Sequence, residues 1–125
     1  MTLNEYQEKA MATCMPSCDN MAYMLINLMA EVGELAGKIS KPLRKGKTIF
    51  RSNALTPMHL LDEDDLFDFE DMRQEIILEA GDILWQLSGV LDVLDVTLEE
   101  AGIKNIEKLA SRAKRGKIDG DGDHR

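Results

Sequence analysis

The sequence is short of aromatic residues, cysteines and long apolar runs, and each shortage excludes a class of protein. Aromatic residues make up only 5% of the 125 positions, whereas apolar residues of all kinds make up 44%. Leu, Ile, Met and Ala dominate this set, a composition that suits helices better than β-sheets. No apolar run approaches membrane-spanning length, and the N-terminus lacks the pattern of a signal peptide. We therefore expect a cytoplasmic, all-α protein with no membrane partner.

The cysteine count and the charge exclude two further kinds of site. Cys14 and Cys18 are the only cysteines. Because no second pair or histidine cluster completes a zinc site, we interpret them as small apolar residues near a helix end. The net charge of -8 argues against a nucleic-acid polymer as partner. The charge is uneven, since residues 62–71 hold seven acids and no base, whereas residues 104–117 hold six bases and one acid.

The hydrophobic pattern predicts a single domain over residues 1–125, built as an antiparallel bundle of four to five helices. The helices are expected at residues 3–14, 21–41, 68–96 and 97–115, the second stopping before Pro42 and the last pausing at Gly102. Residues 42–67 are expected to be mostly loop, with room for a short helix. A loop of this length indicates a functional lid or an interface arm. Residues 116–125 form a tail without a helical pattern.

Apolar residues follow a heptad-like spacing in the two long helices, which predicts that these helices pack in a bundle. The rows are Met21, Leu25, Leu28, Val32, Leu35 and Ile39 in one helix, and Ile76, Ala80, Ile83, Leu87, Val90 and Leu94 in the other. A second apolar row, Ile77, Leu84 and Leu91, widens the apolar face of the helix expected at residues 68–96. Burial on more than one side implies neighbours on more than one side, within a bundle or an oligomer.

Two pairs of acids with the same spacing border these apolar rows. Glu31 and Glu34 are three residues apart in one helix, as are Glu79 and Asp82 in the other. Residues at this spacing lie on one face of a helix. Packing the two apolar rows together is therefore expected to bring four carboxylates to one rim of the interface. Glu75, one turn before Glu79, is a candidate fifth member.

Crowded carboxylates repel one another unless a cation lies between them. All-oxygen coordination suits Mg²⁺ or Mn²⁺, and the absence of histidine at these positions argues against a di-iron bundle. Magnesium held by a few carboxylates takes phosphate oxygens as further ligands, which indicates a polyphosphate substrate. Acids at this spacing are also common on solvated helices. The interruption of both pairs by glycine, Gly33 and Gly81, favours the metal site.

The acidic strings resemble a known family of enzymes. Glu31-Val-Gly-Glu34-Leu and Glu79-Ala-Gly-Asp82-Ile-Leu-Trp-Gln-Leu look like the two metal-binding motifs of the MazG-like, all-α nucleoside triphosphate pyrophosphohydrolases. The run from Asn105 to Arg125 is similar to the end of single-domain members. The connection between the two motifs is longer here than is usual in the family, so the acidic segment at 62–71 resembles an insertion.

The resemblance implies an activity and a set of site residues. The expected reaction is Mg²⁺-dependent hydrolysis of a nucleoside triphosphate, in which water attacks the α-phosphate and releases the monophosphate and pyrophosphate. The implied metal ligands are Glu31, Glu34, Glu79 and Asp82. The implied residues near the nucleotide are Asn105, Lys108, Arg112 and Arg115. A homodimer or homotetramer is expected.

Roles within the site stay open at this point. Glu34, the acid furthest from the apolar row, is the preferred general base, although any of the four acids fits. Three basic residues recur on one face of the last helix: Lys108, Arg112 and Arg115. They either bind the outer phosphates or stabilise the C-terminal end of the helix dipole. Lys38 is a weaker phosphate candidate with the same alternative. Trp85 either stacks on a base or, as we prefer, fills the core beneath the metal.

Two alternatives to this function remain. The same site suits a hydrolase of a modified or alarmone-type nucleotide. A protein of another class, a non-catalytic helical interaction module, would use the acidic segment as a docking surface and leave the carboxylate pairs solvated.

Overall fold

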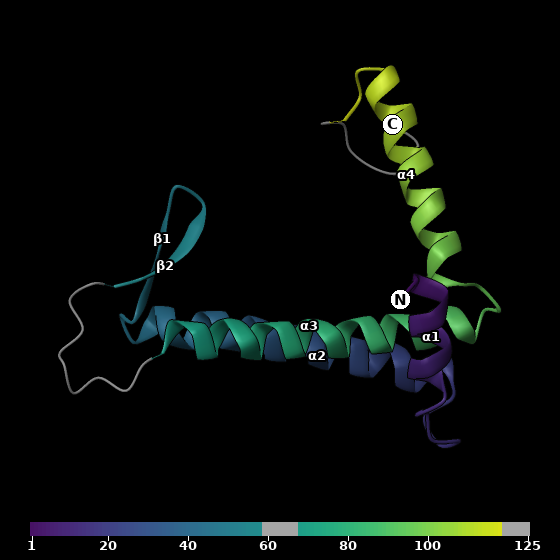
Figure 1. The fold of residues 1–125 in the computed structure, drawn as a ribbon, viewed down its shortest axis with the longest axis horizontal. Helices are drawn as coiled ribbons and strands as arrows, with labels where there is room; N and C mark the ends of the chain where they lie inside the picture. Colours follow the sequence, from purple (N-terminus) through teal and green to yellow (C-terminus); the bar gives the residue numbers. More distant parts are fainter. Residues whose placement is uncertain (59–67, 119–125) are drawn as a thin grey trace.

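A long antiparallel pair of helices forms the centre of the molecule. The computed structural model describes residues 1–58 and 68–118. Its elements are α1 (Leu3–Met11), α2 (Met21–Arg44), β1 (Thr48–Arg51), β2 (Ala54–Pro57), α3 (Phe69–Asp92) and α4 (Leu98–Lys114). Figure 1 shows α2 and α3 side by side, with α1 across one end of the pair, the β-hairpin at the other end, and α4 projecting away. The fold is mostly helical, as predicted, although one chain does not by itself form a closed bundle.

Helices α2 and α3 pack closely at Met24 and Gly89. Met24 is fully buried, and Gly89 is buried opposite it. A Cβ atom added at Gly89 would overlap the thioether of Met24, so Met24 would have to change its side-chain conformation to admit one. The predicted apolar rows are only partly covered in the described chain. Their exposed members include Leu25, Val32, Leu87 and Leu94.

Helix α2 continues through Pro42, and the prediction that it stops before this proline was wrong. Pro42 lies in the last turn, so the hydrogen bond that it cannot donate is lost only at the end of the helix. The helix ends at Arg44, and Gly46, two residues beyond, has a left-handed φ of 71°. The Lys47 N–H donates to the Pro42 carbonyl at 2.9 Å, and the Gly46 N–H donates to the Leu43 carbonyl at 3.1 Å. This is a Schellman motif, which sets the end of the helix.

The ends of two other helices and the interior of a third differ from the prediction. Helix α1 ends at Met11, three residues before the expected Cys14. Helix α3 ends at Asp92 rather than residue 96, and Asp95 beyond it has a left-handed φ of 55°. Helix α4 begins at Leu98, after an N-cap at Thr97, and runs through Gly102 without the expected pause. Its backbone hydrogen bonds therefore outweigh the glycine penalty of ~1 kcal/mol.

A β-hairpin occupies residues 48–57 of the expected loop. Strands β1 and β2 pair antiparallel, with Thr48 opposite Pro57 and Arg51 opposite Ala54. The turn residues Ser52 and Asn53 both have positive φ, 47° and 65°, as a two-residue type I′ hairpin turn requires. The prediction of a loop or short helix was wrong for residues 48–57. Residues 59–67, with most of the acidic segment, lie outside the described residues.

Hydrogen bonds of two side chains, the amide of Gln7 and the indole of Trp85, fix helix α1 to the central helix pair. Gln7 is buried; its Nε2 donates to the Val96 carbonyl at 3.1 Å, and its Oε1 accepts from the Leu98 N–H at 2.7 Å. The indole N–H of Trp85 donates to the Ala10 carbonyl at 3.0 Å. These bonds join α1 to α3 and to the start of α4. Among the described helices, none has the length and apolar character needed to cross a membrane.

Candidate metal centre

Three carboxylates from two helices meet on one side of the central pair. Glu31 comes from α2, and Glu79 and Asp82 come from α3. Each offers an oxygen, and these oxygens lie within 4.8 Å of one another. The one-turn spacing of Glu79 and Asp82 places both on the face of α3 that Glu31 approaches across the interface. The helical periodicity of α3 therefore places Glu79 and Asp82 together, and the packing of α2 on α3 adds Glu31.

The electrostatic environment of Glu31 reflects this crowding. Burial is the largest cause that raises the pKa of Glu31, and the negative charges of Asp82, Glu34 and Glu79 raise it further. Asn27, one turn earlier in α2, donates from Nδ2 to a Glu31 carboxylate oxygen at 2.9 Å and partly offsets the shift in pKa. The ionised form of Glu31 is therefore disfavoured unless a cation is near.

These donors fit a hard divalent cation. All three groups are carboxylates, the ligand type that Mg²⁺ and Mn²⁺ prefer. Asp82 is exposed, and Glu31 and Glu79 are half-buried, so one side of the cluster is open to further ligands. Magnesium bound by few protein ligands takes water and phosphate oxygens at its other positions. The arrangement is thus suited to a metal that also binds a phosphorylated substrate.

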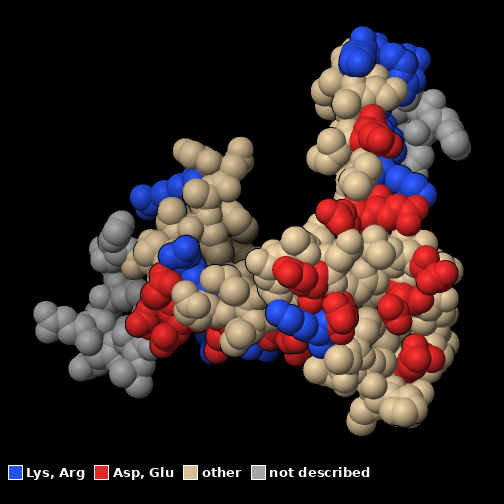
Figure 2. Space-filling view, turned by 45° about the vertical axis from the view of Figure 1, so that its right-hand side comes forward, with Lys and Arg blue, Asp and Glu red and all other residues tan. Residues whose placement is uncertain are grey.

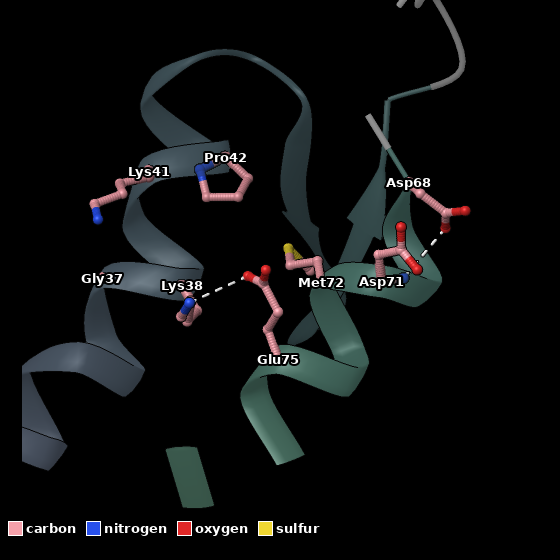
Figure 3. A pocket seen from close by; sticks show the side chains of 8 residues that line it. All are labelled: Gly37, Lys38, Lys41, Pro42, Asp68, Asp71, Met72 and Glu75. Carbon is pink, nitrogen blue, oxygen red and sulfur yellow. Dashed lines mark hydrogen bonds and ion pairs between the residues drawn. The ribbon is translucent and has the colours of Figure 1, made fainter. Parts of the chain in front are cut away.

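Lys38 lies at one end of the carboxylate cluster. Its ammonium group is 3.4 Å from a Glu79 oxygen and 3.4 Å from a Glu75 oxygen. Glu75, the candidate fifth acid, is therefore paired with lysine and is not a member of the three-carboxylate cluster. Beyond Lys38 lies a pocket of about 320 Å³ between the end of α2 and the start of α3. Figure 3 shows Lys38 pointing toward Glu75 in this pocket, whereas Lys41 points away from it.

Helix α1 lies at the other end of the cluster. The Tyr6 hydroxyl donates to the Gly81 carbonyl at 3.4 Å. Burial raises the pKa of this hydroxyl, and the negative charge of Asp82 raises it further. The indole of Trp85 is hydrogen-bonded to α1, also donating to the Thr13 hydroxyl at 3.0 Å. This contact favours a structural position for Trp85 over stacking on a base.

The structure does not bring all the predicted site residues together in one chain. Glu34 is exposed and is not one of the three clustered carboxylates. The α4 residues, Asn105, Lys108, Arg112 and Arg115, lie on a helix that points away from the α2–α3 pair. Figure 2 shows basic side chains gathered at the far end of this helix and acidic ones near its start. Arg112 differs from its neighbours on this helix because it is only 5% exposed.

Two residues near the cluster were missed by the sequence interpretation. Asn27 carried a usable signal, because it precedes Glu31 by four residues and such pairs contact each other on a helix. Tyr6 carried no local signal, since its contact with Gly81 spans 75 positions. Its placement depends on how α1 packs.

Comparison with known proteins gives a family match over most of the chain. Residues 20–116 match the MazG nucleotide pyrophosphohydrolase domain. The chain is also similar to the Gene 37 protein of Mycobacterium phage L5, with 32% identity over 109 residues, covering 87% of this chain and 80% of that protein. No solved structure matches the chain significantly.

Proposed function

The chain belongs to the family of MazG nucleotide pyrophosphohydrolase domains, and from this premise we propose that it hydrolyses a nucleoside triphosphate with Mg²⁺. The products are the nucleoside monophosphate and pyrophosphate. The observation that carries the proposal is the meeting of Glu31, Glu79 and Asp82 across α2 and α3 in a chain of this family. Crowded carboxylates of this kind are the expected ligands of a hard dication.

Each residue near the cluster has a proposed part. Glu31, Glu79 and Asp82 bind the cation, and Asn27 orients Glu31 through its hydrogen bond. The bound Mg²⁺ supplies neutralisation of phosphate charge and activation of water. Glu34, one turn from Glu31 and exposed, is our proposed general base, since it is free to accept the proton of an attacking water.

Self-assembly is part of the proposal. Large apolar side chains are exposed on all three long helices, among them Ile26, Met29, Leu78, Ile103 and Ile106. Faces of this kind indicate contact with another subunit. We propose a homodimer or homotetramer in which α4 of one copy packs against another. Only such packing would bring Asn105, Lys108 and Arg115 to a nucleotide bound at the carboxylates.

The test is pyrophosphate release from a panel of substrates. The common ribo- and deoxyribonucleoside triphosphates, oxidised or methylated ones and guanosine polyphosphates are incubated with the protein, with Mg²⁺ or with EDTA. We expect Mg²⁺-dependent release from at least one of them, and a loss of at least about 100-fold in Glu31→Gln and Asp82→Asn.

A matched control and a competing outcome complete this test. Glu8→Gln removes an exposed carboxylate on α1 that is not part of the cluster, and its activity should equal that of the parent protein. Preference for a modified or guanosine polyphosphate substrate would assign the chain to that subclass. The absence of metal-dependent release from every compound would refute hydrolysis and favour a non-catalytic interaction module.

A further inference from the structure

Lys38 connects the carboxylate cluster with the neighbouring pocket. Its ammonium group contacts Glu79, a member of the cluster, and Glu75, which lines the pocket, at the same distance of 3.4 Å. The Glu79 side chain is only 12% exposed, and that of Lys38 is 32% exposed. This pair is therefore less screened by solvent than an ordinary surface ion pair.

A lysine in this position competes for the Glu79 carboxylate with any metal that binds the cluster. One Glu79 oxygen is a ligand atom of the candidate metal site, and a Glu79 oxygen also faces the ammonium group of Lys38. A dication and an ammonium ion repel each other, so the arrival of a metal weakens the attraction of Lys38 to Glu79. Lys38 would then be available to an anion next to the metal. In the proposed function, this anion is the polyphosphate of the substrate.

We propose that Lys38 is an exchangeable internal counter-ion that couples metal binding to phosphate binding. Without ligands, it neutralises part of the charge on Glu79 and lowers the affinity for free metal. When polyphosphate binds, its ammonium group moves from Glu79 to a phosphate oxygen, and the affinity for metal rises. Because coupling is reciprocal, metal also raises the affinity for polyphosphate. This inference rests on the proposed function and adds the order in which charges are exchanged.

The sequence offers a matched control for this role. Lys41 lies on the same helix one turn later, lines the same pocket and carries the same charge. It points away from Glu75, and among the described residues it forms no ion pair with the clustered acids. Lys38→Met and Lys41→Met therefore make the same change in net charge, but only the former removes the proposed counter-ion.

The experiment measures Mn²⁺ affinity by electron paramagnetic resonance, with and without pyrophosphate as the probe of phosphate binding. The Mn²⁺ that pyrophosphate binds in protein-free solution is measured first and subtracted. Without pyrophosphate, Lys38→Met should bind Mn²⁺ about three- to tenfold more tightly than the parent protein, because a nearby positive charge is gone. Pyrophosphate should raise the affinity for Mn²⁺ in the parent protein, and this increase should be about three- to tenfold smaller in Lys38→Met. Lys41→Met should match the parent within about twofold in both measurements.

The outcomes separate this inference from the proposed function. Unchanged or weaker Mn²⁺ binding by Lys38→Met, with normal binding by the parent, would overturn the counter-ion role and leave the metal site intact. An undiminished effect of pyrophosphate in Lys38→Met would overturn the coupling. No Mn²⁺ binding by the parent protein would refute the proposed function as well. Lys38→Arg, which keeps the charge, should restore parental values. Misfolding alone would lower Mn²⁺ affinity, so tighter binding is a result that damage cannot produce.

Discussion

Replacing Glu31 with glutamine should make the metal-free protein more stable while removing its response to magnesium. The clustered oxygens lie within 4.8 Å of one another. Two unit charges at that separation repel by about 1 kcal/mol in water and by about 3.5 kcal/mol at an effective dielectric constant near 20. Because Asp82 is exposed, the lower figure applies. An increase of ~1 kcal/mol in the free energy of unfolding corresponds to a rise in Tm of roughly 3–6 °C for a domain of this size.

The difference in stability between Glu31→Gln and the parent protein should depend on pH, because the pKa of Glu31 is shifted by folding. The pKa is raised in the folded protein by burial and by neighbouring acids, so the fold favours protonated Glu31. This contribution to stability is fully present below the unfolded pKa and is lost as the pH rises through the folded value. At pH 7 the parent protein therefore carries the whole repulsion. The difference in Tm between Glu31→Gln and the parent should shrink as the pH is lowered toward about 4.

Magnesium should reverse the order of stability. A ligand at 100 times its Kd stabilises the folded state by about 2.7 kcal/mol, which exceeds the gain from the substitution. Thermal unfolding is followed by circular dichroism with EDTA or MgCl₂ at matched ionic strength. We expect Glu31→Gln to be the more stable protein with EDTA and the less stable one with Mg²⁺. An equal response of both proteins to Mg²⁺ would refute the reasoning, and Glu8→Gln should follow the parent throughout.

Four further substitutions test the packing and the site. Gly89→Ala should lower the free energy of unfolding by about 0.5–2 kcal/mol in urea titrations, because the overlap of the new methyl group with Met24 outweighs the gain in helix propensity. Gly33→Ala, where a Cβ meets no atom within 4 Å, should raise it by about 0.5–1 kcal/mol. Gln7→Leu should cost about 1–3 kcal/mol and speed hydrogen exchange at the start of α4, since a buried N–H loses its acceptor. Glu34→Gln should slow pyrophosphate release by about 10²- to 10⁴-fold with Mn²⁺ affinity nearly unchanged; a large loss of Mn²⁺ affinity would make Glu34 a ligand instead of the base.

The helices were predictable because their signal is local. The apolar rows identify α2 and α3 from short stretches of sequence. The sequence predicted the end of α2 too early, because proline usually stops a helix and Pro42 is the first such signal. The glycine of the Schellman motif, Gly46, lies four residues later. The hairpin was missed because its turn is Ser-Asn, a weaker signal than Asn-Gly or Asp-Gly.

The site was predictable only within each helix. The spacing of Glu79 and Asp82 predicts that they share a face, and the structure brings Glu31 to them as expected. Spacing alone does not determine the rotation of one helix against another. The pairing of Lys38 with Glu79 and the approach of Tyr6 to Gly81 depend on that rotation and on the packing of α1, so neither followed from the sequence.

In the proposed assembly, the projection of α4 from the rest of the chain makes its folding depend on protein concentration. Most of its 17 residues are exposed, and only Leu98 and Arg112 are buried. An isolated helix of this length is only marginally stable in water, because nucleation is costly and few contacts offset it. On dilution below the dissociation constant of the proposed assembly, the amide protons of α4 should lose protection before those of α2 and α3. Regulation of subunit association would then also regulate whether the basic end of the helix is ordered.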